Sequence, residues 1–443
     1  MKNCGRCTSG RDCTNCPKID NYHPPVIVGV TSNPPCAENL GELQVACDSG
    51  IAPPFGIAID IGTTTLVFEL ISLRTGARVS MFSFVNSQRA YGLDVISRIT
   101  RANNGDAAHL NSAIMGDLRK GIDLLLADKS VENRDISCVA VCGNTTMLHL
   151  LQNFSCETLG VFPFAPVSIS SVQKKFFGYD MMILPSVSAF IGADVVAGIF
   201  CSAELHKTAN SSLLIDLGTN GEIALFGGSL EEILVTSVAA GPAFEGGNIS
   251  SGVASIPGAI YAAQFSAEND TFSYNTIGGK PPVGICGTGI ISICAELVRH
   301  GLIDETGLLI TGESVTVVTG ESPIIFTQKD VREVQLAKSA VRAGIEILLE
   351  EAGISYENIE KVFLAGGFGY TMESDSAVTI GLFPTQLKNK IQAVGNAALG
   401  GCAKFLLNPA CEPEIQKIAA NAKEINLATH PRFEEIFIMH CDF

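Results

Sequence analysis

The sequence predicts an α/β protein in which one strand–turn–strand motif occurs twice, about one domain length apart. The first copy is IAIDIGTTTLVF, at residues 57–68, and the second is LLIDLGTNGEIAL, at residues 213–225. In each copy an apolar strand ends at an aspartate, Asp60 or Asp216, and a glycine-containing turn leads into a second apolar strand. A third glycine turn follows the apolar strand at residues 362–365.

The composition of these turns suits phosphate binding. The first turn consists of Gly62, Thr63, Thr64 and Thr65, the second of Gly218, Thr219, Asn220 and Gly221, and the third of Gly366, Gly367, Phe368 and Gly369. Small residues leave backbone N–H groups accessible, and glycine tolerates positive φ. An acid at a strand end beside such a turn suits Mg²⁺ bound to a phosphate.

Two such hairpins followed by a Gly-Gly turn resemble the actin, sugar-kinase and heat-shock-chaperone (ASKHA) superfamily. Its members have two duplicated ribonuclease H-like lobes that close on ATP. The resemblance covers residues 56 to about 407. It implies that Asp60–Thr65 and Asp216–Gly221 are the phosphate loops, that Gly366–Gly369 contact adenosine, and that Asp60 and Asp216 hold Mg²⁺. We therefore expect a two-lobed α/β fold.

The composition limits the partners and the compartment. The chain has 443 residues, of which 47% are hydrophobic and 17% charged, so it can bury two or three domain cores. A net charge of −16 disfavours nucleic acid and anionic membrane surfaces. The start of the chain does not resemble a signal peptide, and the long apolar run at residues 181–201 is interrupted by Pro185, Gly192 and Asp194. We expect a cytoplasmic protein that does not enter the membrane.

Four cysteines cluster at the start of the chain, in a C-x2-C-x5-C-x2-C pattern formed by Cys4, Cys7, Cys13 and Cys16. In an intracellular protein such a cluster indicates a metal rather than disulfides. Both zinc and an iron–sulfur cluster accept four thiolates, and a 4Fe-4S cluster is a better match than a 2Fe-2S cluster. Residues 1–16 are thus a metal-binding head, and residues 17–55, with seven prolines, are a linker.

The first predicted lobe spans residues 56–205. We expect a strand at residues 79–84, helices at 92–101 and 110–126, a strand at 137–141 and a helix from Met147. Asp194 begins an apolar helix, where an acid can simply cap free N–H groups. A similar acid in sugar kinases activates the hydroxyl that attacks the γ-phosphate, so the resemblance implies that Asp194 orients a water.

The second predicted lobe spans residues 206–395. Glu245 lies in a glycine-rich loop and could meet a cation or a ribose. Gly287, Thr288 and Gly289 precede the apolar helix at residues 290–299, whose first amides can take an anion. Residues 336–352 form an amphipathic helix. Residues 396–443 begin with a helix that Asn396 opens. The resemblance implies that this helix returns to the first lobe as a hinge and that Asn396 contacts the nucleotide.

Eight motifs occur in a fixed order: GIAIDIGTTT, VCGNTTM, FIGADVVAGI, IDLGTNGEI, AGPAFEG, GICGTGI, LAGGFG and GNAALGG. Together they resemble the reductive activators of corrinoid proteins, iron–sulfur ATPases that return cob(II)alamin to cob(I)alamin and are typically dimeric. Those activators usually begin with a plant-type ferredoxin domain. Here the short cysteine cluster stands in its place, so an external ferredoxin-type donor is the alternative source of electrons.

Two other functions remain open from the sequence. One is a small-molecule kinase of the same superfamily, which would need an acceptor pocket beside Asp194. The clustered cysteines count against it, because a kinase has no use for four thiolates. The other is a nucleotide-gated binding protein with a structural zinc, which needs no redox chemistry.

Overall fold

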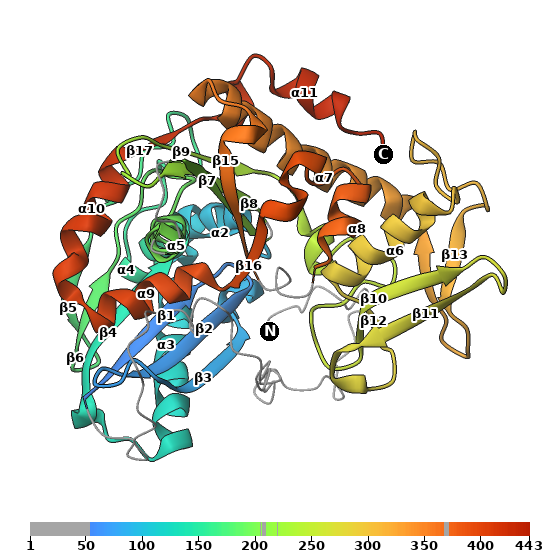
Figure 1. Ribbon diagram of the computed structural model, residues 1–443. Helices are drawn as coiled ribbons and strands as arrows, with labels where there is room; N and C mark the ends of the chain where they lie inside the picture. Colours follow the sequence, from blue (N-terminus) through green and yellow to red (C-terminus); the bar gives the residue numbers. More distant parts are fainter. Residues whose placement is uncertain (1–53, 204, 206–209, 219, 367–371) are drawn as a thin grey trace.

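The computed structural model describes residues 54–443, apart from 204, 206–209, 219 and 367–371. Its centre is formed by two six-stranded mixed sheets (Figure 1). The first sheet has the order β3-β2-β1-β4-β6-β5. Its strands are β1 Phe55–Ile61, β2 Thr65–Ser72, β3 Arg78–Val85, β4 Ile136–Gly143, β5 Val172–Phe176 and β6 Tyr179–Ile183.

The second sheet has the order β16-β15-β7-β8-β9-β17. Its strands are β7 Ser211–Leu217, β8 Gly221–Gly227, β9 Ile233–Val238, β15 Ile359–Ala365, β16 Ile391–Gly395 and β17 Ala422–Glu424. The two sheets share one arrangement. In the first, the β1–β2 hairpin is followed by antiparallel β3 on one side and by parallel β4 and β6 on the other. In the second, the β7–β8 hairpin is followed by antiparallel β9 on one side and by parallel β15 and β16 on the other. The two predicted hairpins are therefore confirmed, and so is the duplicated α/β fold.

The helices surround these sheets and lie between them. They are α2 Val95–Arg101, α3 Ala107–Lys129, α4 Thr145–Gln152, α5 Ala193–Ala203, α6 Gly287–Arg299, α7 Gln328–Ala352, α8 Ser374–Thr379, α9 Ala397–Leu407, α10 Glu412–Asn421 and α11 Phe433–Met439. The helix expected from residue 336 starts earlier, at Gln328. Thr327 and Asp330 form a capping box there, and this polar start precedes the apolar stripe.

Smaller strands form two further sheets beside the second lobe. They are β10 Ala259–Ser266, β11 Thr271–Thr276, β12 Gly284–Ile285, β13 Ser314–Val318 and β14 Ile324–Thr327. Figure 1 shows β10, β11 and β13 beyond α6, away from the two large sheets. The sequence did not predict this addition as a separate unit.

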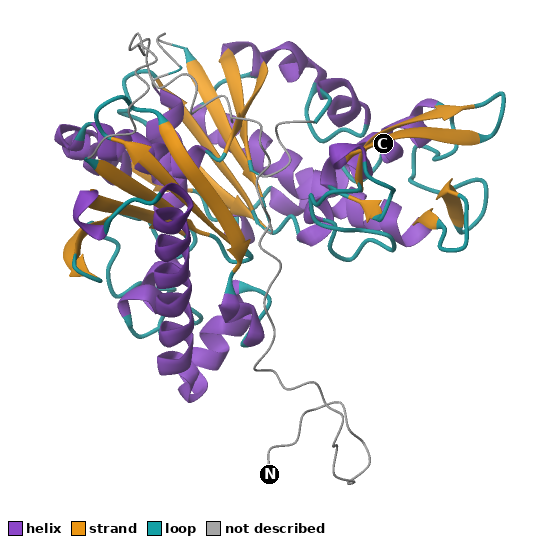
Figure 2. Ribbon diagram, turned by 90° about the horizontal axis from the view of Figure 1, so that it is seen from below, coloured by secondary structure: helices purple, strands orange, loops and turns teal. Residues whose placement is uncertain are grey.

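Helices α5 and α9 pack closely against each other between the two sheets (Figure 1). Figure 2 shows the strands of the large sheets with helices around them. Glycines permit this approach: a Cβ at Gly198 would lie 2.9 Å from Leu214 Cδ2 of the second sheet, and a Cβ at Gly401 would clash with the carbonyl of Ala197. One apolar core runs from the first sheet through these helices to one face of the second sheet. The opposite face of the second sheet packs on a separate core that includes α6, α7 and α11.

The cysteine cluster and residues 17–53 of the proline-bearing segment lie outside the described residues, so their predicted roles stay predictions, whereas Phe55 already belongs to β1. The apolar run at residues 181–201 contains the end of strand β6 and most of helix α5, with an irregular segment between them. Among the described residues, no helix is both long and apolar enough to cross a membrane.

Candidate nucleotide site

Asp60 and Asp216 occupy equivalent positions in the two lobes, each next to the last residue of the first hairpin strand. In the first lobe Asp60 pairs in register with Cys142 of β4, and in the second Asp216 pairs with Ala365 of β15. Gly366 then follows with φ +100°, where a Cβ would lie 2.5 Å from the Leu217 carbonyl oxygen and 3.1 Å from Asp216 Oδ1. Glycine is required here, because it lets the third turn start directly beside Asp216.

Asp60 is held by groups from both lobes. Asn396 Nδ2 donates to Asp60 Oδ2 at 2.7 Å, and the Cys142 thiol lies 3.9 Å from Oδ1. Asn396 directly follows β16, and its Oδ1 accepts from the Leu399 N–H at 2.7 Å, which caps α9. The structure therefore places Asn396 against the Asp60 carboxylate, and its predicted nucleotide contact stays a prediction.

Asp194 lies in the first turn of α5, where its Oδ1 accepts from the Val195 N–H at 2.9 Å. Gly192 makes room for it: a Cβ there would lie 2.6 Å from the Gly143 carbonyl oxygen and 2.7 Å from Asp194 Oδ1. Asp194 thus lies beside the end of β4, the strand that neighbours Asp60.

These aspartates and Glu222 form a group of four carboxylates that repel one another. Burial, reinforced for Asp194 by the nearby Asp60 charge, raises the pKa of Asp60 to about 6 and that of Asp194 to about 7. Burial together with the charges of Asp60, Asp194 and Glu245 raises the pKa of Asp216 to about 7. Burial and the charges of Asp194 and Asp216 also raise the pKa of Glu222 well above its usual value.

The donor set of this group fits Mg²⁺. No Lys, Arg or His in the described part of the chain forms an ion pair with any of the four carboxylates. A divalent cation would supply the missing positive charge. Within the same residues, no three His, Cys, Asp or Glu side chains are placed to hold a metal directly. Nucleotide and water oxygens would therefore complete the coordination of Mg²⁺ near Asp60 and Asp216.

The first predicted phosphate loop is fixed from several sides. Asn86 Nδ2 donates to the Gly62 carbonyl at 2.9 Å, and its own N–H donates to the Thr64 carbonyl at 2.9 Å. Asn144 Nδ2 donates to Thr63 Oγ1 at 2.9 Å. Inside the turn, the Gly62 N–H donates to the Thr65 carbonyl at 3.0 Å. This loop is therefore rigidly positioned at the end of β1.

The second predicted loop is closed by a bond of 2.9 Å from the Gly218 N–H to the Asn220 carbonyl, and Gly221 then begins β8. Glu245 comes close to this loop, since its Oε1 lies 3.9 Å from where a Cβ of Gly218 would be. The structure thus places Glu245 near the loop that follows Asp216, and its predicted contact with a cation or a ribose stays a prediction. Four predicted contact residues fall outside the described residues: Thr219, Gly367, Phe368 and Gly369.

Gly287, Thr288 and Gly289 are buried at the start of α6. A Cβ at Gly287 would clash with the Phe244 carbonyl, and one at Gly289 with the Ile260 carbonyl. Close packing of α6 thus accounts for these glycines in the structure. They adjoin the loop that carries Glu245, and their proposed contact with the nucleotide is untested.

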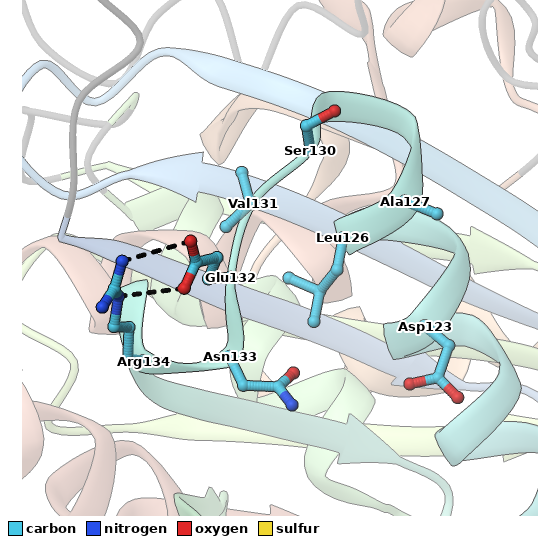
Figure 3. Close-up of a pocket in the computed structure, with 8 residues that line it drawn as sticks. All are labelled: Asp123, Leu126, Ala127, Ser130, Val131, Glu132, Asn133 and Arg134. Atoms are coloured by element: carbon cyan, nitrogen blue, oxygen red, sulfur yellow. Dashed lines mark hydrogen bonds and ion pairs between the residues drawn. The ribbon is translucent and has the colours of Figure 1, made fainter.

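A hollow on the surface of the first lobe lies apart from the four carboxylates. Figure 3 shows it where α3 ends and β4 begins, with a volume of about 770 Å³. An exposed ion pair between Arg134 Nε and Glu132 Oε2, at 3.0 Å, lies at its edge. Asp60 pairs with the opposite end of β4, so the hollow is separate from the carboxylates.

The comparisons with known proteins show the family of the chain. Residues 55–208 match the model described as "RACo middle region", and residues 210–443 match the one described as "C-terminal domain of RACo the ASKHA domain". The second match alone covers more than half of the chain. The chain belongs to the RACo family.

Two curated relatives and one solved structure are similar to this RACo-family chain. The "Corrinoid activation enzyme RamQ" of Eubacterium limosum is 35% identical over 425 residues, covering 88% of this chain and 70% of the relative. The "[Co(II) methylated amine-specific corrinoid protein] reductase" of Methanosarcina barkeri is 27% identical, covering 88% and 77%. The solved "Reductive activator for corrinoid,iron-sulfur protein" superposes with a TM-score of 0.80 at 32% identity, covering 89% and 67%.

Sequence reasoning missed two kinds of residue in this RACo-family site. Glu222 stands directly opposite Asp216 in the hairpin register, so counting the same number of residues outward from the turn along both strands would have found it. Val67 occupies the equivalent place opposite Asp60. Asn86 and Arg98 come from segments without any motif, and no sequence signal indicated them. Asn86 donates to the Gly62 carbonyl of the first loop and Arg98 donates to the Thr63 carbonyl.

Proposed function

We propose that this protein couples ATP binding and hydrolysis to the one-electron reduction of a corrinoid protein from cob(II)alamin to cob(I)alamin. The observation that carries the proposal is the meeting of Asp60 and Asp216, at the ends of equivalent strands, with Asp194 of α5, in a chain of the RACo family. The relatives named above are corrinoid activators and reductases.

The ATP part of the proposal rests on the two hairpins. The Asp60 and Asp216 carboxylates hold Mg²⁺ through water, and the turns after them bind the phosphates. The segment that starts at Gly366 contacts adenine and ribose. Asn396 joins Asp60 to the α9 helix, so lobe closure around the nucleotide can be transmitted between the lobes.

Asp194 is the candidate for orienting the attacking water. Its pKa of about 7 is close to that of an effective general base at neutral pH. It lies near Asp60. A group that acts on a phosphate bound at the turn after Asp60 has to lie there. Asp194 would accept a proton from the water as that water attacks the γ-phosphate.

The redox part rests on the cysteine cluster. Cys4, Cys7, Cys13 and Cys16 would hold a 4Fe-4S cluster, which supplies one electron to the corrinoid. The proline-bearing linker would let this head reach a corrinoid protein. The protein would act in the cytoplasm as a homodimer, and an external ferredoxin-type protein would reload the cluster.

Metal analysis of anaerobically purified protein tests the redox part. Iron with inorganic sulfide, and a paramagnetic signal on reduction that disappears in a Cys4→Ala/Cys7→Ala variant, are the expected results. Zinc alone would contradict the redox role and favour a nucleotide-gated binding protein. Transfer of phosphate from ATP to a small molecule, without any effect on a corrinoid, would favour a kinase instead.

A further inference from the structure

Arg98 is a buried cation directly behind the first phosphate loop. It lies on α2 and has no exposed surface. Its Nη2 donates to the Thr63 carbonyl, and its Nε donates to the Gly92 carbonyl at 3.0 Å. Nη1 lies 3.3 Å from Gln88 Oε1 and 3.0 Å from Met147 Sδ. All four partners are neutral.

This environment leaves the charge of Arg98 without an ion-pair partner. No carboxylate of the described residues forms an ion pair with it, and burial, together with the nearby charge of Arg89, lowers its pKa to about 10, which the charge of Asp94 opposes only in part. Neutral oxygens recover only part of the cost of removing a guanidinium from water. A methionine or leucine would fill the same core position without that cost. The buried charge therefore calls for an anion, and the turn that Arg98 contacts is the one predicted to bind phosphate.

We propose that Arg98 is a positioning residue for the nucleotide phosphates: it fixes the backbone of the first loop through Thr63, and its charge is balanced by the phosphate bound there. The inference rests on the ATP binding proposed above. Arg98 needs no direct contact with the phosphate, because unlike charges attract strongly across a short, poorly solvated gap.

The two loops differ in a way that supports this role. Arg98 adds a positive charge behind the first loop, whereas the acidic Glu245 comes close to the second. Asn86 and Asn144 hold the same first loop with uncharged groups. Arg98 is therefore the group expected to make affinity depend on the number of phosphates.

The test compares the binding of Mg²⁺-AMPPNP, ADP and AMP to the full chain by calorimetry, with Arg98→Gln against wild type. We expect roughly a tenfold loss of affinity for AMPPNP, a smaller loss for ADP and little change for AMP. Thermal unfolding without nucleotide should be unchanged or shifted upward, because a buried charge has been removed. Arg101→Gln is the matched control. It removes the same charge from the same helix, but Arg101 is exposed and pairs with Asp106 at 3.0 Å.

Arg98→Lys separates charge from position, since lysine keeps the charge but lacks the fork that reaches both Thr63 and Gly92. We expect an affinity for AMPPNP between those of wild type and Arg98→Gln. Wild-type affinity in Arg98→Gln, or an equal loss in Arg101→Gln, would overturn the inference and leave the proposed function standing. Failure of both Arg98 variants to fold would also overturn it, because a purely structural role predicts that result. A wild-type chain that binds no nucleotide would overturn both proposals.

Discussion

Asn396 Nδ2 donates a hydrogen bond to Asp60 Oδ2 at 2.7 Å, although the two residues lie 336 positions apart in the sequence. Asn396 directly follows β16 of the second lobe and caps α9, which packs on α5 and β1 of the first. Asp60 of the first lobe is thus bonded to the residue at which the chain leaves the second lobe and enters α9. A change in the angle between the lobes must change this bond.

Asn396→Ala should therefore do more than remove a helix cap. It loses the cap and the bond to Asp60, and we expect the free energy of unfolding to fall by about 2 kcal/mol. Asn396→Ser is the matched control, because serine still caps α9 but is too short to reach Asp60. Denaturant unfolding should rank wild type above Ser and Ser above Ala. Equal stability of Ser and wild type would mean that the Asp60 contact contributes nothing measurable.

The two hairpin aspartates should be needed for Mg²⁺-ATP and not for folding. Asp60→Asn and Asp216→Asn keep the side-chain shape but remove a charge that would face Mg²⁺, so calorimetry should show affinities at least tenfold weaker. Asp180→Asn is a suitable control, because Asp180 is half-exposed and pairs with Lys175 at 2.8 Å away from the site. Wild-type affinity in both test variants would refute the assignment of these turns.

Asp194→Asn should separate hydrolysis from binding. Asparagine caps a helix about as well as aspartate, so the fold and the affinity for ATP should persist. It cannot accept a proton from water, so turnover should fall by about a hundredfold or more. Steady-state release of phosphate, measured together with nucleotide affinity, checks both halves. Unchanged turnover would mean that Asp194 only caps free N–H groups at the start of α5.

The raised pKa of Asp216 predicts a pH-dependent stability difference. The carboxyl binds its proton more tightly in the folded state, with a pKa of about 7, than at its ordinary value of 3.8, so wild type loses stability as the pH rises through this range. Asn does not titrate. Without nucleotide and with Mg²⁺ removed by EDTA, Asp216→Asn should therefore have the higher Tm at pH 8.5, and its advantage should shrink at pH 5. A difference that grows on acidification would contradict the burial of this carboxylate.

The predictable part of the site is the part encoded by local pattern. The strand-Asp-turn-strand pattern located Asp60 and Asp216, and the apolar residues after Asp194 placed that residue at a helix start, because these features depend on neighbouring residues. Glu222 joins the group through cross-strand register, and Asn396 meets Asp60 only when the chain returns across the hinge. Arg98 has no local signature, because two of its four partners are backbone carbonyls that any sequence supplies, and Met147 lies 49 positions away.

Reduction of a corrinoid protein tests the central claim most directly. A corrinoid protein in the cob(II) state is mixed anaerobically with this chain, a low-potential reductant and Mg²⁺-ATP, and cob(I)alamin is followed by its absorbance. The account predicts rapid cob(I) formation with ATP, little with AMPPNP or with Asp194→Asn, and loss of the reaction in Cys4→Ala/Cys7→Ala. Equal cob(I) formation with and without ATP, or none with the intact, iron-loaded chain, would contradict it.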